Sequence, residues 1–338
     1  MEEGVAVKVR IATRKSRLAL VQTRWVAARM REGRPDLEIE EVSIVTEADK
    51  ILDRPLTAIG GKGLFVSEVE GLVVRGEADI AVHSLKDVPG DVDLPEGLDL
   101  ICIPAREDPH DVLITRDGSQ LDDLSAGARV GTTSLRRISQ LSAHRPDLQY
   151  ATLRGNVGTR LERLQEGKFD AIVLAAAGLR RLDLLETVPH QVLPIEVCMP
   201  AVGQGTLAIE GRVDDAAILE LLAPLEDADT RIRTEAERAL LRRLMGSCRV
   251  PISGHAQLTP DRSRLRLDGL VGSLDGARVI HASAERYVHG RSREALRDEA
   301  RALGEEVAAT LLARGADALM REAEATVLQR EREAERSR

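Results

Sequence analysis

Short apolar runs alternate with helix-forming stretches along the first two thirds of the chain. ADIAVHS (78–84) and DAIVLAAAG (170–178) are apolar at almost every position, so neither face of these strands suits water. Apolar strands separated by helices are typical of parallel sheets that helices cover on both faces. The pattern therefore predicts an α/β fold with parallel-type sheets. The strands predicted in this way are 8–13, 37–45, 78–84, 98–105, 111–115, 128–134, 148–154, 170–178 and 202–211.

The pattern changes after Pro224. A long helix is predicted over 228–246, three short strands follow, and another helix is predicted over 291–314. This order is typical of a small α+β domain. The final stretch, 321–338, is mostly charged and predicts a solvated or frayed helical tail.

Composition argues against several classes of protein. The formal net charge is −8, and the aromatic residues are one Trp, two Tyr and two Phe, so base stacking on single-stranded nucleic acid is not expected. The three cysteines are far apart, which argues against a disulfide scaffold and favours a reducing compartment. No apolar stretch has the length of a membrane span, and the first residues lack the pattern of a signal peptide. We expect a cytoplasmic protein without a membrane or nucleic-acid partner.

Polar residues gather where predicted strands turn into helices, at the edge where parallel sheets hold their ligands. Cations, hydroxyl groups and helix amino ends at these turns all favour an anion. We therefore expect a ligand with several carboxylates or phosphates. The alternative is that surface arginines only solvate helix ends, which suits a single arginine better than the whole set. The set is Arg14, Ser16, Lys62, Lys86, Thr132, Ser134, Arg136, Arg137, Arg154, Asn156 and Arg160.

Asp87 is the one carboxylate among these cationic turns. Neighbouring cations such as Lys86 should keep it ionised, yet an ionised carboxylate repels an anionic ligand. Its position is useful if the reaction creates a cation that needs stabilisation. The alternative is an ordinary turn aspartate before Val88 and Pro89.

A single thiol, Cys248, follows the predicted helix in RLMGSCRVPISGH, behind two small residues and beside Arg249. The neighbouring sequence offers it no disulfide partner and no metal site. The residues alone allow either an attachment point for a covalent group or a buried, inert cysteine.

Metal and nucleotide sites are not indicated. The seven histidines show no metal-ligand spacing, so zinc is not expected. His83, on a buried strand, is more typical of a satisfied core group than of a ligand. The stretch GGKG (60–63) lacks the spacing and the hydroxyl residue of a phosphate-binding loop.

Eight motifs follow one another along the chain: RIATRxSxLA, GGKGLF, AVHSxKDVP, GTxSLRR, LRGNVGTRL, AGLxRL, PAVGQG and Gly-x-Cys-x-x-Pro. In this order they resemble the porphobilinogen deaminases, also called hydroxymethylbilane synthases, from residue 8 to residue 260. The resemblance implies a transferase that joins four porphobilinogens head to tail with loss of ammonia. Hydrolysis then releases hydroxymethylbilane for tetrapyrrole biosynthesis.

The resemblance also implies two lobes like the domains of periplasmic binding proteins, with the catalytic cleft between them. A third, α+β domain carries the cysteine, and the protein is expected to be a monomer. The expected divisions are 1–104 with 202–223 for the first lobe, 105–201 for the second, 224–320 for the third domain and 321–338 for a charged tail.

A dipyrromethane cofactor, held by a thioether to Cys248, is part of what the resemblance implies. Each pyrrole carries an acetate and a propionate, so the arginines at the turns would bind the carboxylates of cofactor and growing chain. Asp87 would hold pyrrole N–H groups and offset the charge of the azafulvenium cation that remains when ammonia leaves. Phe65 would pack against a pyrrole ring or belong to the core. No metal is implied.

Two rival functions account for part of the same residues. A two-lobed carboxylate receptor would explain the arginines and leave Asp87 and Cys248 without a role. An enzyme acting on phosphorylated metabolites would need a phosphate loop or metal ligands, and the sequence offers neither.

Overall fold

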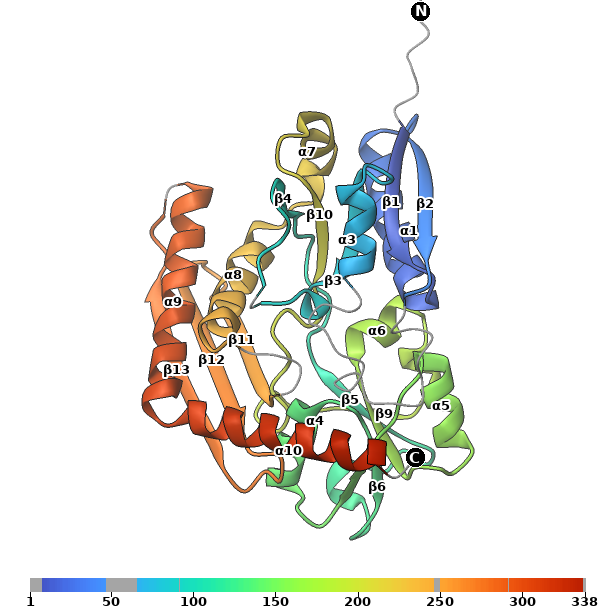
Figure 1. The fold of residues 1–338 in the computed structure, drawn as a ribbon, viewed down its shortest axis with the longest axis vertical. Coiled ribbons are helices and arrows are strands. Elements are labelled where there is room, and N and C mark those ends of the chain that lie inside the picture. The colour runs from blue at the N-terminus through green and yellow to red at the C-terminus, as the bar shows by residue number, and fades with distance from the viewer. Residues whose placement is uncertain (1–7, 47–65, 91, 246–249, 291, 337–338) are drawn as a thin grey trace, which may run out of the picture.

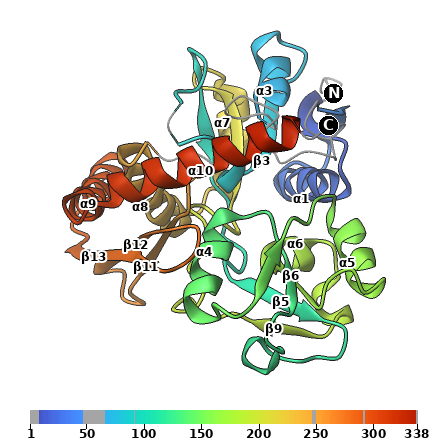
Figure 2. The same ribbon diagram turned by 60° about the horizontal axis from the view of Figure 1, so that its bottom comes forward.

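The computed structural model describes residues 8–46, 66–90, 92–245, 250–290 and 292–336. These residues form three sheets with helices packed against them (Figure 1). The first two sheets belong to two α/β lobes, and the third belongs to a C-terminal α+β domain that lies beside both lobes (Figure 2). The predicted α/β class with a smaller α+β domain is confirmed.

The first sheet has five strands in the order β2-β1-β3-β10-β4 and is mixed, not purely parallel. β1 runs parallel to β2 and β3, whereas β10 lies antiparallel to β3 and β4. The chain returns from the second lobe at the end where β3 and β4 finish, so β10 must run in the opposite direction. The strands are β1 (Lys8–Arg14), β2 (Glu38–Ile44), β3 (Ile80–Ser84), β4 (Leu98–Cys102) and β10 (Leu207–Arg212), and the helices are α1 (Arg17–Gly33), α3 (Ser67–Val74) and α7 (Ala216–Leu222).

The second sheet has the order β7-β6-β8-β5-β9 and is also mixed. β6 is parallel to β7 and β8, and β5 is antiparallel to β8 and β9. The sequence predicted neither β9 nor α7, because both elements are short and their hydrophobic periodicity is therefore weak. The strands are β5 (Asp111–Thr115), β6 (Arg129–Gly131), β7 (Gln149–Ala151), β8 (Ala171–Ala175) and β9 (His190–Val192), and the helices are α4 (Leu135–His144), α5 (Val157–Gln165) and α6 (Ala176–Arg181).

The third sheet is an antiparallel meander of β11 (Ile252–Leu258), β12 (Arg264–Gly272) and β13 (Val279–Tyr287). Two helices, α8 (Ala228–Arg243) and α9 (Arg293–Ala313), pack together and cover one face of it. Leu240, Leu267 and Leu311 are fully buried in this core. The long predicted helix and the three predicted strands are confirmed.

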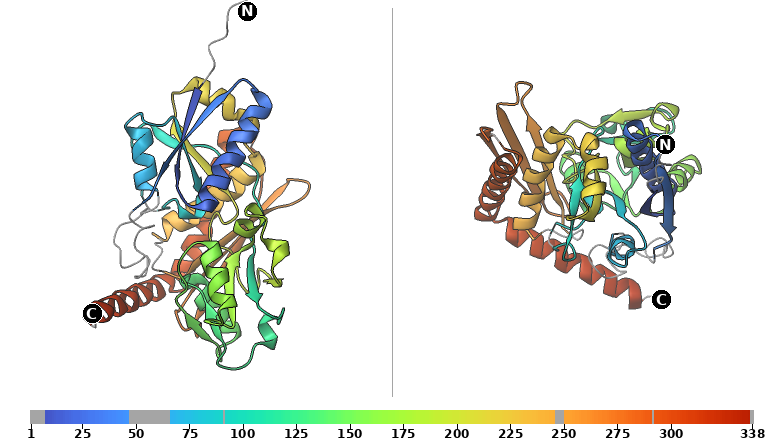
Figure 3. Two further views of the ribbon diagram at one scale, coloured as in Figure 1. Left: turned by 90° about the vertical axis from the view of Figure 1, so that its right-hand side faces the viewer. Right: turned by 90° about the horizontal axis from the view of Figure 1, so that it is seen from above.

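The charged C-terminal stretch is helical, as we expected, and most of its described side chains have exposed surface, but one face contacts the protein. It belongs to α10 (Ala316–Arg336), which begins after a turn at Gly315, where φ is +93°, and projects away from α9 (Figure 3). Ala323 and Val327 are buried, four residues apart on one face of this helix. A narrow apolar stripe of this kind is easily overlooked among charged residues, yet it suffices to hold a helix against the protein.

None of the described helices combines the length with the apolar character that a membrane crossing requires. Cys102 and Cys198 are free and buried.

Candidate active site

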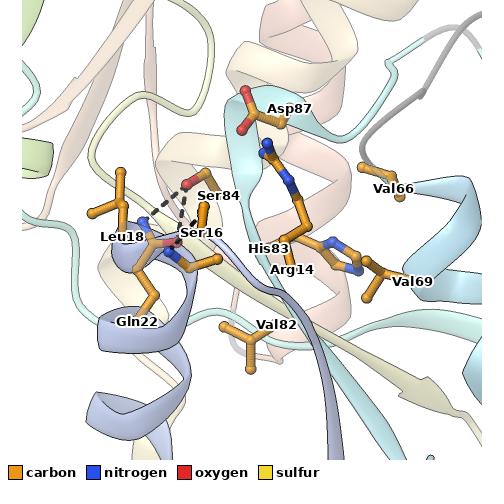
Figure 4. A pocket seen from close by; sticks show the side chains of 11 residues that line it. Arg14, Ser16, Leu18, Gln22, Val66, Val69, Val82, His83, Ser84 and Asp87 are labelled. Carbon is orange, nitrogen blue, oxygen red and sulfur yellow. Dashed lines mark hydrogen bonds between the residues drawn. The ribbon is translucent and has the colours of Figure 1, made fainter. Parts of the chain in front are cut away.

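A pocket lies at the edge of the first lobe where the parallel strands β1 and β3 end (Figure 4). Arg14 ends β1, Ser16 precedes α1, and Ser84 ends β3. Asp87 follows in a single 3-10 turn, Leu85–Asp87. Because parallel strands present their carboxyl ends on one side of the sheet, side chains distant in sequence meet at this edge.

Two local interactions shape the α1 side of the pocket. The Ser16 hydroxyl oxygen accepts a hydrogen bond from the Ala19 backbone N–H at 3.3 Å, so Ser16 caps the start of α1. The Gln22 side-chain amide donates to the Ser84 hydroxyl at 3.0 Å. Gln22 and Ser84 both line the pocket, and the sequence did not predict either as a site residue.

Arg14 and Asp87 face one another across the pocket. Figure 4 shows the Arg14 side chain extending toward the Asp87 carboxylate, with the His83 ring beside it. A carboxylate therefore shares the pocket with a guanidinium, a hydroxyl and an amide. Of the described first-lobe residues that the sequence singled out, Arg14, Ser16 and Asp87 line this pocket, and Lys86 is not among the lining residues.

His83 lines the pocket, yet its ring is 2.9 Å from the Glu210 carboxylate through Nε2, and both side chains are buried. The interpretation of His83 as a satisfied core group is confirmed. Glu70 lies beside this pair, and its pKa is raised to about 7, first by burial and then by the charge of Glu210.

Lys86 contacts the segment by which the chain returns from the second lobe to β10. Its ammonium group donates to the Gln204 side-chain oxygen at 3.2 Å. The pKa of Lys86 is lowered to about 8. The largest cause is desolvation by the surrounding protein, and the charges of Arg137 and Arg136 lower the pKa further, whereas the charge of Asp87 raises it. The side chain still retains exposed surface, so it is surrounded by protein without being sealed from water. Lys86 therefore lies within electrostatic range of the second-lobe arginines.

Arg136 and Arg137, expected to bind carboxylates of a ligand, bind a carboxylate of the chain itself. Arg136 Nη2 and Arg137 Nη2 each donate to Asp111 at 2.6 Å. Arg136 also donates to the Met199 carbonyl oxygen and Arg137 to that of Val173. Burial would raise the Asp111 pKa, but the two guanidinium charges outweigh it and hold the pKa well below the usual aspartate range. Asp111 begins β5, and nothing in the sequence around it indicates that it pairs with these two arginines.

A second-lobe cation cluster, formed by Arg154, Arg160 and Arg163 beside Arg137, surrounds the start of α5. Arg160 donates through Nε to the Gly155 carbonyl oxygen at 2.8 Å. The pKa of Arg160 is lowered to about 10, first by burial and then by the charges of the other three arginines. The lowered pKa of Arg160 shows that it lies among like charges, which favours binding of an anion beside it.

Two polar side chains at the second-lobe turns satisfy backbone groups. Asn156 caps α5, its side-chain oxygen accepting from the Thr159 N–H at 2.9 Å. The buried Thr132 hydroxyl accepts from the Ser134 N–H at 3.2 Å, and Ser134 precedes α4 without a side-chain capping bond of its own. These two contacts order the turns that carry the arginines.

One further cation, Arg181, was not predicted from the sequence. Arg181 ends α6 and donates to the Gly205 carbonyl oxygen at 2.8 Å, and burial lowers its pKa to about 10. The sequence signal existed, because Arg181 follows a buried strand as the other turn arginines do. Lys62, Phe65 and Cys248 lie outside the described residues. Among the described residues, no group of His, Cys, Asp and Glu side chains could hold a metal ion.

Comparisons with known proteins agree over nearly the whole chain. Residues 9–220 match a family model described as the dipyromethane cofactor binding domain of porphobilinogen deaminase, and residues 231–313 match its C-terminal domain. The porphobilinogen deaminase of Syntrophotalea carbinolica is 49% identical over 312 residues, which are 92% of this chain and 95% of that protein. The porphobilinogen deaminase of Brevibacillus brevis is 47% identical, covering 93% and 97%.

Among solved structures, the probable amino-acid ABC transporter extracellular-binding protein ytmK from Bacillus subtilis overlaps with a TM-score of 0.40 at 8% identity. That overlap covers 65% of this chain and 90% of the other. The two family matches together span far more than half of the chain, and these two relatives cover 92% and 93% of it. This chain belongs to the porphobilinogen deaminase family.

Proposed function

We propose that this chain has the activity for which its family is named. It is a transferase that condenses four porphobilinogens head to tail, releases one ammonia at each step and frees hydroxymethylbilane by hydrolysis. The observation that carries the proposal is one carboxylate, Asp87, in a pocket beside the Arg14 guanidinium and the Lys86 ammonium group. Cations bind the carboxylates of the substrate, and the lone anion serves the reaction.

The carboxylate-binding part of the site draws on both lobes. In the first lobe, Arg14, Ser16 and Lys86 offer a guanidinium, a hydroxyl and an ammonium group at adjacent turns. In the second lobe, Arg160 and Arg181 are cations whose pKa values burial has lowered, which means that an incoming anion would relieve an unfavourable state. Each porphobilinogen presents an acetate and a propionate, which matches sites of this kind.

Asp87 acts on the positive charge that the reaction creates. Loss of ammonia from porphobilinogen leaves an azafulvenium cation whose charge is shared by the pyrrole nitrogen. The Asp87 carboxylate accepts a hydrogen bond from pyrrole N–H and stabilises this cation, a contact worth about 3 kcal/mol once bound substrate displaces water from the site.

The chain's residues also suit a dipyrromethane. Two pyrroles carry four carboxylates, and the second-lobe cation cluster has an excess of positive charge that these would offset. When bound, the group supplies the covalent starting point for chain growth. We propose a thioether to the Cys248 sulfur as its attachment, because Cys248 stands in the family's Gly-x-Cys-x-x-Pro pattern.

The role of Asp87 is tested by Asp87→Asn, which keeps the shape and removes the charge. Turnover per cofactor-carrying molecule, counted by intact mass, should fall about 100-fold or more. Asp87→Glu should retain a little activity, and Asp93→Asn, at an exposed position six residues along, should match the wild type. A near-wild-type kcat for Asp87→Asn would refute this role of Asp87, whereas a wild-type protein without turnover would leave the carboxylate-receptor function as the better account.

The attachment is tested by alkylation of denatured protein. After expression in cells that make porphobilinogen, Cys102 and Cys198 should react with iodoacetamide, while Cys248 stays unmodified and the intact mass exceeds the polypeptide mass by one dipyrromethane. After expression in cells that cannot make porphobilinogen, all three thiols should react. Full alkylation of Cys248 in the active enzyme would place the attachment elsewhere.

We also propose a cytoplasmic monomer divided into 1–104 with 202–223, 105–201, 224–320 and a tail at 321–338. Support for the first-lobe division comes from β10, which pairs with β3 and β4 although the whole second lobe separates them in sequence. Support for a reducing compartment comes from the free thiols Cys102 and Cys198. Light scattering during gel filtration tests the monomer, and limited proteolysis tests the divisions.

A further inference from the structure

The segment that follows Asp87 is held by a helix of the third domain. Arg238 on α8 donates through Nη1 to the Val88 carbonyl oxygen and through Nη2 to the Pro89 carbonyl oxygen, both at 3.2 Å. One turn later, Arg242 Nε donates to the Gly90 carbonyl oxygen at 3.3 Å. Three successive carbonyl groups thus receive donors from one face of α8.

Packing reinforces these hydrogen bonds. A Cβ atom added at Gly90 would lie 2.7 Å from Leu241 Cδ2, so only a glycine lets the backbone come this close to α8. On the other side of Asp87, the Leu85 backbone N–H donates to Thr206 O at 2.9 Å, and Leu85 itself is buried. The short stretch that carries Asp87 is therefore tied down at both ends.

Arg238 is an unusual choice for a purely structural contact. Burial lowers its pKa to about 10, and the charge of Arg242 adds to that effect. Its guanidinium donates to two carbonyl oxygens, and no hydrogen bond to a carboxylate accompanies them among the described contacts. A planar fork with two parallel donors fixes direction as well as distance, which a lysine ammonium cannot do.

We propose that Arg238 is a positioning residue for Asp87. The Arg238 fork fixes the Asp87 turn relative to α8, whose last residue, Arg243, is followed closely in sequence by Cys248. The third domain thereby sets the position of the turn that carries the Asp87 carboxylate. This inference rests on the proposed function, namely the catalytic role of Asp87 and the anchor at Cys248.

Arg231 offers a matched control on the same helix. It also joins α8 to the first lobe, donating through Nη1 to the Leu100 carbonyl oxygen at 2.9 Å and through Nε to Glu226 at 2.7 Å. Leu100 lies on β4 and Glu226 lies just before α8, and neither belongs to the turn that carries Asp87. Arg231→Lys therefore weakens the same interface without touching the Asp87 segment.

The test compares Arg238→Lys with Arg231→Lys in the cofactor-carrying enzyme. Arg238→Lys should lower kcat about 10-fold or more, since small misplacements of a reacting group have effects of this size. KM should stay within about threefold, because the carboxylate-binding arginines are untouched, and the dipyrromethane mass should be unchanged. Arg231→Lys should keep kcat within about twofold at a similar loss of Tm. Equal kcat values for the two variants would overturn the inference, because a general weakening of the interface affects both.

The double variant Arg238→Lys/Asp87→Asn separates this inference from the proposed function. If Arg238 acts through Asp87, the double variant should be no slower than Asp87→Asn alone. Multiplied losses would overturn the positioning role while Asp87 keeps its own. A near-wild-type Asp87→Asn would overturn both. Should Arg238→Lys fail to fold, Arg242→Lys, which removes the third bond, must still lower kcat severalfold at unchanged cofactor mass, or the inference is wrong.

Discussion

Asp111→Asn should destabilise the protein strongly, because it leaves two buried cations without their counter-charge. Asp111 is completely buried and accepts hydrogen bonds from Arg136, Arg137, Gln204 and Cys198 at 2.6 to 3.3 Å. Asparagine preserves the shape, but its amide group presents N–H donors to guanidinium groups that are donors themselves. Removing one partner of a buried ion pair costs about 3–5 kcal/mol.

Urea unfolding followed by circular dichroism measures this loss. With a urea m value of about 3 kcal/mol per molar, a loss of about 4 kcal/mol moves the midpoint down by about 1.3 M. The control is Glu41→Gln, which breaks an exposed ion pair with Arg24 and should cost less than about 1 kcal/mol.

The buried ion pair also makes the free energy of unfolding depend on pH. Folding lowers the pKa of Asp111, so the ion pair contributes its full stability above the unfolded-state value of about 3.9 and loses it as the pH falls through the folded value. The difference between wild type and Asp111→Asn should therefore be constant near neutral pH and shrink below about pH 4. A loss under about 1 kcal/mol at neutral pH, or a difference that does not shrink in acid, would refute the reasoning.

Three further measurements address other parts of the molecule. Gly205→Ala should destabilise far more than Gly97→Ala: both glycines have positive φ, but a Cβ at Gly205 would lie 2.3 Å from a backbone carbonyl oxygen, whereas Gly97 faces open space. Equal urea midpoints for the two variants would contradict this. Folding raises the pKa of Glu70 from 4.5 to about 7, so the wild type should lose stability as the pH rises across that interval. Glu70→Gln should abolish this dependence of stability on pH, and a dependence that persists in the variant would belong to another group. Cys102 and Cys198, whose pKa values burial raises to about 12, should resist a thiol reagent at about pH 8 until urea is added, and rapid labelling of the native protein would contradict their burial.

The residues of the first-lobe pocket could be predicted because the relevant signal is local. A buried strand such as β3 is recognisable from its own apolar residues, and the polar group that follows it must lie at the carboxyl edge of the sheet. Arg14, Ser16 and Asp87 were found in this way, and they line one pocket. The cap at Ser16 depends only on the four residues around it, which is why it was also predictable.

Contacts between distant residues could not be predicted. Asp111 lies 25 residues from Arg136, and nothing in either stretch marks the pairing, so the contacts of Arg136 and Arg137 with this buried carboxylate emerge only in the structure. Gln22 and Ser84 meet because α1 lies beside β3, and no local pattern records that approach.

By itself, the amino-acid sequence determined the alternation of strands and helices, the two classes of domain and the turns at which charged groups gather. Each of these depends on periodicity and residue type within a few neighbours. Only the tertiary structure decided the direction of β10, the burial of Val327 in a charged stretch and the hold of Arg238 on the segment after Asp87. These features depend on which surfaces meet when the chain closes on itself, and the partner of a buried charge is decided only there.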